Sequence, residues 1–138
     1  MREVKDYIGE YFKDYRNVSN KEIYQSFNSQ TYTPEVFYKL RETEQARCHV
    51  MMKKITCKDG FTVSVQATYT HYCSPRETIR SEHFNFYNEF ELGFPNKKDK
   101  LLMPYCEDNK RPKDTVYSCV PKDIINQVIK KHGGLLTN

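Results

Sequence analysis

Two stretches of alternating apolar and polar residues flank a Lys58-Asp59-Gly60 turn, and this arrangement constrains the fold more than any other sequence feature. Apolar residues take every second position of residues 61–69, and a shorter alternation covers residues 50–57. Such alternation places one set of side chains on one face of a strand. Because an Asp-Gly pair accepts the positive φ angles of a tight turn, the pattern predicts an antiparallel hairpin.

Further elements are predicted on both sides of this hairpin. A third alternating run occupies residues 84–94, a short strand is expected over 116–120, and a short helix over 96–105. Pro121 opens a last helix with an apolar stripe, and Gly133 suits the left-handed residue that ends a helix. Before residue 50, apolar spacing and capping residues predict helices over 4–15, 21–27 and 34–47.

The predicted fold class is therefore α+β, with N-terminal helices followed by an antiparallel sheet and one or two packed helices. We divide the 138 residues into a helical N-terminal segment, 1–49, and an α+β sheet domain, 50–138. Aromatic residues make up 14% of the chain and can supply a core that few aliphatic residues would fill. No secretion signal or membrane-spanning stretch is evident, so we expect a cytoplasmic protein whose five cysteines are thiols.

Positive charge collects in the C-terminal part of the chain. Residues 1–50 carry eight basic and eight acidic side chains, so the net charge of +4 belongs to residues 51–138. The basic side chains form short runs, namely Lys53-Lys54, Lys97-Lys98-Lys100, Lys110-Arg111-Lys113 and Lys130-Lys131. Such runs could attract a polyanion, but acids such as Asp99 and Asp114 interleave with them. We interpret them as an ordinary solvated surface.

No sequence motif points to catalysis. The chain has no Gly-rich phosphate loop, no GxSxG and no HExxH. A zinc site could draw on Cys48, His49, Cys57, His71 and Cys73, but their spacing lacks the paired ligands of structural zinc sites. We expect no metal, no cofactor and no enzymatic activity.

The connection that follows the predicted hairpin carries the best candidates for partner binding. Loops held by a rigid sheet often carry binding groups, and Tyr and Arg dominate interface hot spots. The candidate residues are Tyr69, Tyr72, Arg76 and Arg80. A structural corner, with the tyrosine packed and the arginines paired to neighbouring acids, is the alternative.

The predicted helices 21–27 and 34–47, followed by the hairpin, also resemble a winged helix-turn-helix. In that geometry Lys39, Arg41 and Arg47 would face DNA. Glu35 at the start of the second of these helices would repel phosphates, and Glu42 and Glu44 balance the basic residues. A DNA-binding regulator is therefore the second hypothesis.

Several short segments resemble a group of small proteins carried by phages and integrated elements of gut bacteria. The segments are Ile55–Phe61, Ser64–Gln66, His71–Arg76, Glu91–Pro95 and Lys131–Gly134. The resemblance covers about residues 51–135, excludes residues 1–50 and brings no established activity. Small phage proteins without catalytic motifs include anti-CRISPR and other anti-defence inhibitors. The resemblance therefore implies a non-catalytic inhibitor that occludes a host protein or nucleoprotein, such as a CRISPR–Cas effector.

Overall fold

An antiparallel sheet and two helices form the part of the fold described by the computed structural model, which comprises residues 4–17, 52–67, 71–74 and 87–136. This is the α+β class that the sequence predicts. The strands pair in the order β1-β2-β3-β4, with bounds β1 Ile55–Thr56, β2 Thr62–Gln66, β3 Glu89–Gly93 and β4 Val116–Pro121. The helices are α1 (Tyr7–Lys13) and α4 (Lys122–Lys131), with 3-10 turns η1 (Tyr15–Asn17) and η4 (Met103–Tyr105).

The predicted hairpin is confirmed as the pair β1–β2. Ile55 pairs with Val63, and the turn between the strands contains Gly60 at a φ of 95°. The Asp59 carboxylate accepts a hydrogen bond of 2.9 Å from the backbone N–H of Phe61, which stabilises the turn from within. The Asp-Gly signal therefore identified the turn correctly.

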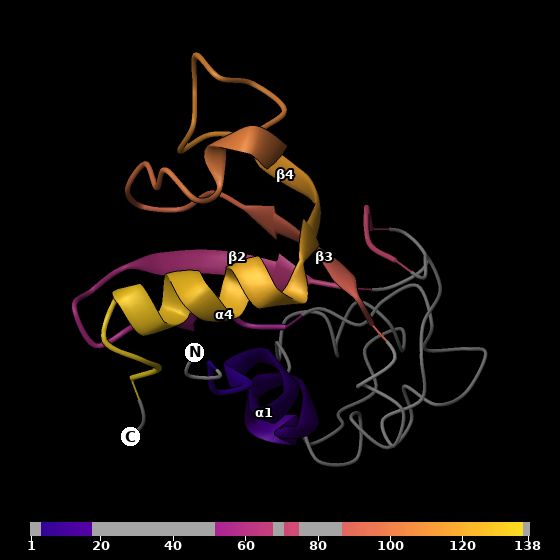
Figure 1. The fold of residues 1–138 in the computed structure, drawn as a ribbon, viewed down its shortest axis with the longest axis vertical. Coiled ribbons are helices and arrows are strands. Elements are labelled where there is room, and N and C mark those ends of the chain that lie inside the picture. Colours follow the sequence, from indigo (N-terminus) through magenta and orange to yellow (C-terminus); the bar gives the residue numbers. More distant parts are fainter. Residues whose placement is uncertain (1–3, 18–51, 68–70, 75–86, 137–138) are drawn as a thin grey trace, which may run out of the picture.

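The hydrophobic core lies between one face of the sheet and the two helices. Helix α4 crosses this face, and α1 lies next to α4 (Figure 1). The sheet contributes Val63, Val65, Phe90, Leu92, Tyr117 and Val120 to the core, and the helices add Ile8, Phe12, Ile125, Val128 and Ile129. Burial of each such side chain stabilises the fold by about 1.5–3 kcal/mol, so the alternation in the strands fixes which face of the sheet is covered.

The ends of α4 agree with the sequence prediction. Pro121 stands directly before the helix, Lys130 and Lys131 occupy its last turn, and Gly133 adopts a φ of 92°. Basic side chains in the last turn are favourable because the C-terminal end of a helix carries partial negative charge. A residue with a side chain at Gly133 would be strained by its φ and would also approach Lys58 to 3.3 Å.

Polar contacts join α1 to α4. The Asn126 side chain accepts a hydrogen bond of 3.1 Å from the buried N–H of Ile8 and donates one of 3.2 Å to Asp6. Asp6 also caps α1 through the N–H of Gly9 and pairs with Lys122 at 2.9 Å. These bonds satisfy the first N–H groups of α1, which have no partner within the helix.

Other expectations are refined or lie outside the described residues. The helix expected over 96–105 is a turn followed by the short η4. The third alternating run is described from residue 87 onward, and there it forms the strand Glu89–Gly93. The helices predicted over 21–27 and 34–47, and most of the boundary region near residue 50, fall outside the described part of the chain. Among the described helices, none combines the length and apolar character needed to cross a membrane.

Replacing Asn126 with alanine should lower the free energy of unfolding by about 2 kcal/mol, because the buried N–H of Ile8 would lose its acceptor. Urea denaturation followed by circular dichroism measures this change. The matched control is Gln127→Ala, an exposed position on the same helix, which should change the free energy by no more than about 0.5 kcal/mol. Equal effects of the two substitutions would contradict the role given to Asn126.

Candidate functional site

Tyr72 is the predicted partner-binding residue that falls within the described part of the chain. Its side chain is 47% exposed, although its backbone is held on both sides. The N–H donates to Oε1 of Glu91 at 3.3 Å, and the carbonyl oxygen accepts from the N–H of Cys119 at 3.0 Å. The other predicted residues lie outside the described ranges: Tyr69, Arg76 and Arg80 of the same connection, and Lys39, Arg41 and Arg47 of the DNA-binding hypothesis.

A β-bulge in β4 supplies the backbone donor that holds Tyr72. The pairing of β3 with β4 shifts its register opposite Glu91, where β4 places two residues, Ser118 and Cys119. Cys119 has a φ of 50°, a left-handed conformation that is uncommon for a residue with a side chain. Bulges redirect backbone groups and side chains in this way. Here the bulge turns the N–H of Cys119 toward the segment that carries the exposed ring.

Tyr72 lies on the face of the sheet opposite α4, which we call the outer face. Phe90 and Leu92 of β3 point into the core, so the side chain of Glu91 between them projects to the outer face. Its hydrogen bond to Tyr72 therefore places the 71–74 segment there. Ser74 then joins the sheet beside β3 through backbone bonds with Glu89 of 3.0 and 3.2 Å. The sheet therefore fixes the backbone that carries the exposed ring at two residues. Tyr72 is bonded to Glu91 and Cys119, and Ser74 is bonded to Glu89.

Phe94 is a second exposed aromatic residue, and it follows directly after the last residue of β3, Gly93. Its side chain is 47% exposed and its φ is 52°. Its N–H donates to the carbonyl of Thr115 at 3.0 Å, and its carbonyl accepts from Nζ of Lys54 at 3.3 Å. In the sequence, Phe94 belongs to the end of the third alternating run, and nothing in the Gly-Phe-Pro pattern predicts that its ring is exposed.

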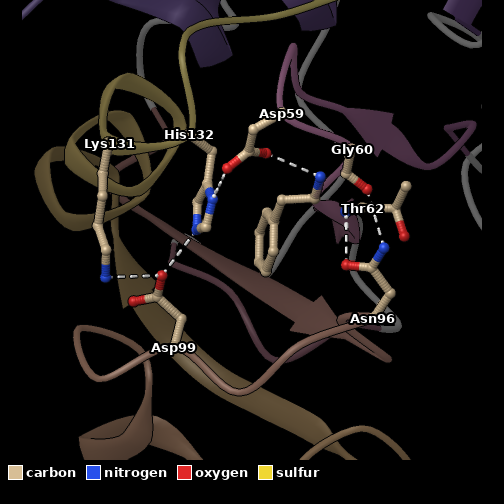
Figure 2. A network of polar contacts seen from close by, with 8 residues as sticks. Asp59, Gly60, Thr62, Asn96, Asp99, Lys131 and His132 are labelled. Carbon is tan, nitrogen blue, oxygen red and sulfur yellow. Dashed lines mark hydrogen bonds and ion pairs between the residues drawn. The ribbon is translucent and has the colours of Figure 1, made fainter.

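A polar cluster joins the hairpin turn, the loop after β3 and the end of α4, and we call it the His132 cluster (Figure 2). His132 Nδ1 lies 2.6 Å from Oδ2 of Asp59, and its Nε2 lies 2.9 Å from Oδ2 of Asp99. The same oxygen of Asp99 accepts a hydrogen bond of 3.0 Å from Nζ of Lys131. The imidazole also stacks on Phe61, with ring centres 4.1 Å apart and planes at 6°.

The two carboxylates of this cluster are held in their ionised form. Burial by itself would raise the pKa of Asp99, but hydrogen bonds from His132, Lys131 and the N–H of Leu101 outweigh it and lower that pKa below its usual value. Hydrogen bonds from His132 and from the N–H of Phe61 lower the pKa of Asp59. An ionised carboxylate only accepts, so both contacts of His132 are hydrogen bonds when both ring nitrogens carry hydrogen.

The geometry of the His132 cluster suits a structural role better than proton transfer. A general base must present a ring nitrogen to its substrate, whereas both nitrogens of His132 face protein carboxylates and one ring face covers Phe61. The cluster therefore fastens three segments that are distant in sequence.

Two of the thiols in the described residues, those of Cys57 and Cys73, are also poorly placed for nucleophilic chemistry. Burial, together with the charge of Asp59, raises the pKa of Cys57 to about 11, so the thiolate that would act as nucleophile is scarce at neutral pH. Cys73 is buried as well. Within the described residues no group of three or more His, Cys, Asp or Glu side chains is arranged to hold a metal ion. Cys48 and His49 lie outside those residues.

No protein-family model, no curated protein and no solved structure matches this chain. The assignment of a function therefore rests on the residues and their geometry.

Replacing Asp99 with asparagine should lower the free energy of unfolding at pH 7 by about 2 kcal/mol, because hydrogen bonds between charged groups are lost. The folded-state pKa of Asp99 is lowered, so its contribution is complete above the unfolded pKa of about 4 and disappears as the pH falls through the folded value. The difference in the free energy of unfolding between the wild type and Asp99→Asn should therefore become smaller below about pH 4. Urea denaturation at a series of pH values measures it.

Asp114→Asn is the control for this experiment, since Asp114 is an exposed carboxylate on a loop. This variant should match the wild type within about 0.5 kcal/mol at neutral pH. If Asp99→Asn lowered the free energy of unfolding by the same amount at every pH, the carboxylate charge would contribute nothing to stability.

Proposed function

We propose that this chain is a non-catalytic inhibitor that binds a host protein or nucleoprotein effector and blocks its working surface. The observation that carries the proposal is the exposed ring of Tyr72 on a backbone fixed by Glu91 and Cys119. An aromatic side chain buries a large area on binding and loses little conformational freedom when its backbone is already ordered. Steric occlusion requires only such a rigid, exposed anchor.

The surroundings of Tyr72 favour a polypeptide surface as the primary partner. Ser118 belongs to the bulge that holds Tyr72, and its hydroxyl donates to the exposed carboxylate of Glu107 at 2.7 Å. The exposed carboxylate of Glu107 would repel phosphates but can pair with a basic side chain of a protein. An aromatic anchor surrounded by polar groups is the usual composition of a protein–protein interface.

We extend the proposal to the class of partner from the resemblance to small phage and mobile-element proteins that the sequence of residues 51–135 leads us to expect. Inhibitors carried by phages act on bacterial defence systems, so the proposed targets are defence effectors, with CRISPR–Cas complexes as one class. This part of the proposal rests on association, because a fold does not specify a function.

The alternative, a winged helix-turn-helix regulator, gains no support from the described residues. Its wing would be the β1–β2 hairpin, which must be available to DNA. The tip of that hairpin is bonded to the rest of the protein, since Asp59 contacts His132 and the Gly60 carbonyl accepts a hydrogen bond of 2.9 Å from Asn96. The recognition residues of this alternative lie outside the described ranges.

Replacing Tyr72 with alanine should weaken binding of the partner by about 2 kcal/mol or more, which is roughly a 30-fold rise in Kd. The partner is first captured from a lysate of a bacterial host and identified by mass spectrometry, and the Kd of each variant is then measured with purified partner by calorimetry. Leu136→Ala is the matched control, because Leu136 is 54% exposed but lies at the C-terminal end, beside β1. It should bind as the wild type does.

A second comparison separates the two hypotheses. A DNA-binding regulator should form a discrete complex in a gel shift that disappears in Arg41→Ala/Arg47→Ala and weakens steeply with salt. The inhibitor should keep its affinity for the protein partner in that variant. A wild-type Kd in Tyr72→Ala together with a specific DNA complex would overturn the proposal.

A further inference from the structure

The lysines of the loop after β3 are not offset by the acid within their run. In the sequence, Asp99 interleaves with Lys97, Lys98 and Lys100 and is expected to share an ordinary solvated surface with them. The side chain of Asp99 is only 1% exposed, and it faces inward to Lys131 and His132 (Figure 2). The three lysines are exposed. The loop therefore presents three positive charges without a neighbouring surface carboxylate from its own sequence.

This loop is also fixed in place. The Asn96 side chain accepts a hydrogen bond of 2.9 Å from the N–H of Thr62 and donates one of 2.9 Å to the carbonyl of Gly60 (Figure 2). The Asn96 N–H donates to the carbonyl of Thr62 at 3.0 Å, and Leu102 N–H donates to the Asp99 carbonyl at 3.1 Å. Anchors on both sides of the lysines keep their backbone ordered, which reduces the entropy lost when a ligand binds.

Phe94 stands at the start of the same loop in a conformation that carries a steric cost. A bulky residue at positive φ is an outlier that persists only when surrounding contacts enforce it. Here the bond from Phe94 to Thr115 and the bond from Lys54 to the Phe94 carbonyl enforce it. The second bond also brings a fourth lysine to the loop. Phe94 therefore presents an exposed ring at the start of a loop with three exposed lysines, and the Lys54 ammonium group bonds to its carbonyl.

We propose that Phe94, Lys54, Lys97, Lys98 and Lys100 form a binding site for single-stranded nucleic acid. Such sites combine cations that follow the phosphate backbone with aromatic rings on which bases stack. A duplex would engage the lysines but not the ring, because its bases are already stacked, and an acidic polypeptide offers no bases to stack on Phe94. Among nearby acids, Asp59 is close enough to Lys97 for their charges to interact, but its carboxylate is already bonded to His132.

The site is separate from Tyr72 and goes beyond inhibition of a protein partner. It lies at the Gly93 end of β3, whereas Tyr72 is held at Glu91 and the bulge. If the effector is a nucleoprotein, Tyr72 would bind its protein and the lysine-bearing loop would bind its nucleic acid. Tyr72→Ala should leave nucleic acid binding unchanged, so that each proposal can fail without the other.

The experiment measures fluorescence anisotropy of a labelled oligothymidine of about 12 nucleotides with the full-length protein over a range of salt concentrations. The logarithm of the binding constant should fall with the logarithm of the salt concentration with a slope of about −2 to −3, as expected for three or four phosphate contacts. In Lys97→Ala/Lys98→Ala the slope should become less steep by about 1.4. Lys13→Ala/Lys130→Ala removes the same charge from exposed helix positions and should retain the wild-type slope.

Substitutions of Phe94 distinguish stacking from a structural role of the ring. Phe94→Gly should raise the Kd for oligothymidine about tenfold because a stacking surface is lost. Its Tm should not fall, because glycine accepts the positive φ without the steric cost. The proposal would be overturned if Phe94→Gly left the Kd for oligothymidine unchanged, or if the two double-lysine variants lost the same amount of affinity. It would also be overturned if the protein bound polyglutamate as tightly as oligothymidine.

Discussion

The buried carboxylate of Asp99 is the contact on which both the described fold and its surface depend. Moving a carboxylate out of water is costly unless hydrogen bonds and charges compensate. Lys131, His132 and the N–H of Leu101 provide that compensation from the end of α4 and from the loop itself. His132 then extends the connection to Asp59 in the hairpin turn. One internal charge therefore holds three segments together, and its burial removes a carboxylate from the surface beside the adjacent lysines.

Backbone strain coincides with the exposed aromatic residues. In the described part of the chain, Phe94 and Cys119 are the non-glycine residues with positive φ. Phe94 is itself exposed, and Cys119 holds the backbone of Tyr72, the other exposed aromatic. Strained conformations tend to gather at functional sites, where the surrounding structure enforces them. This coincidence connects the two proposed binding regions, which lie at different points along β3.

Much of the fold could be predicted because local chemistry decides it. The Asp59-Gly60 turn, the alternating strands and the helix between Pro121 and Gly133 each follow from residues that are close in sequence. The candidate site was only partly predictable. Residue type made Tyr72 a candidate anchor, but the bulge that holds its backbone depends on how β4 pairs with β3. Register between strands separated by more than 20 residues is set by packing of the whole sheet, which no local pattern encodes.

The sequence by itself determined the α+β class, the hairpin, the ends of the last helix and the supply of basic and aromatic side chains. Only the tertiary structure decided which of these charges face water. Asp99 stands between lysines in the chain, where an exposed carboxylate would neutralise them. A turn instead directs its side chain into the protein, while the lysine side chains remain outside. Neighbouring residues in a loop can point in opposite directions, so the charge of a surface depends on three-dimensional contacts rather than on order along the chain.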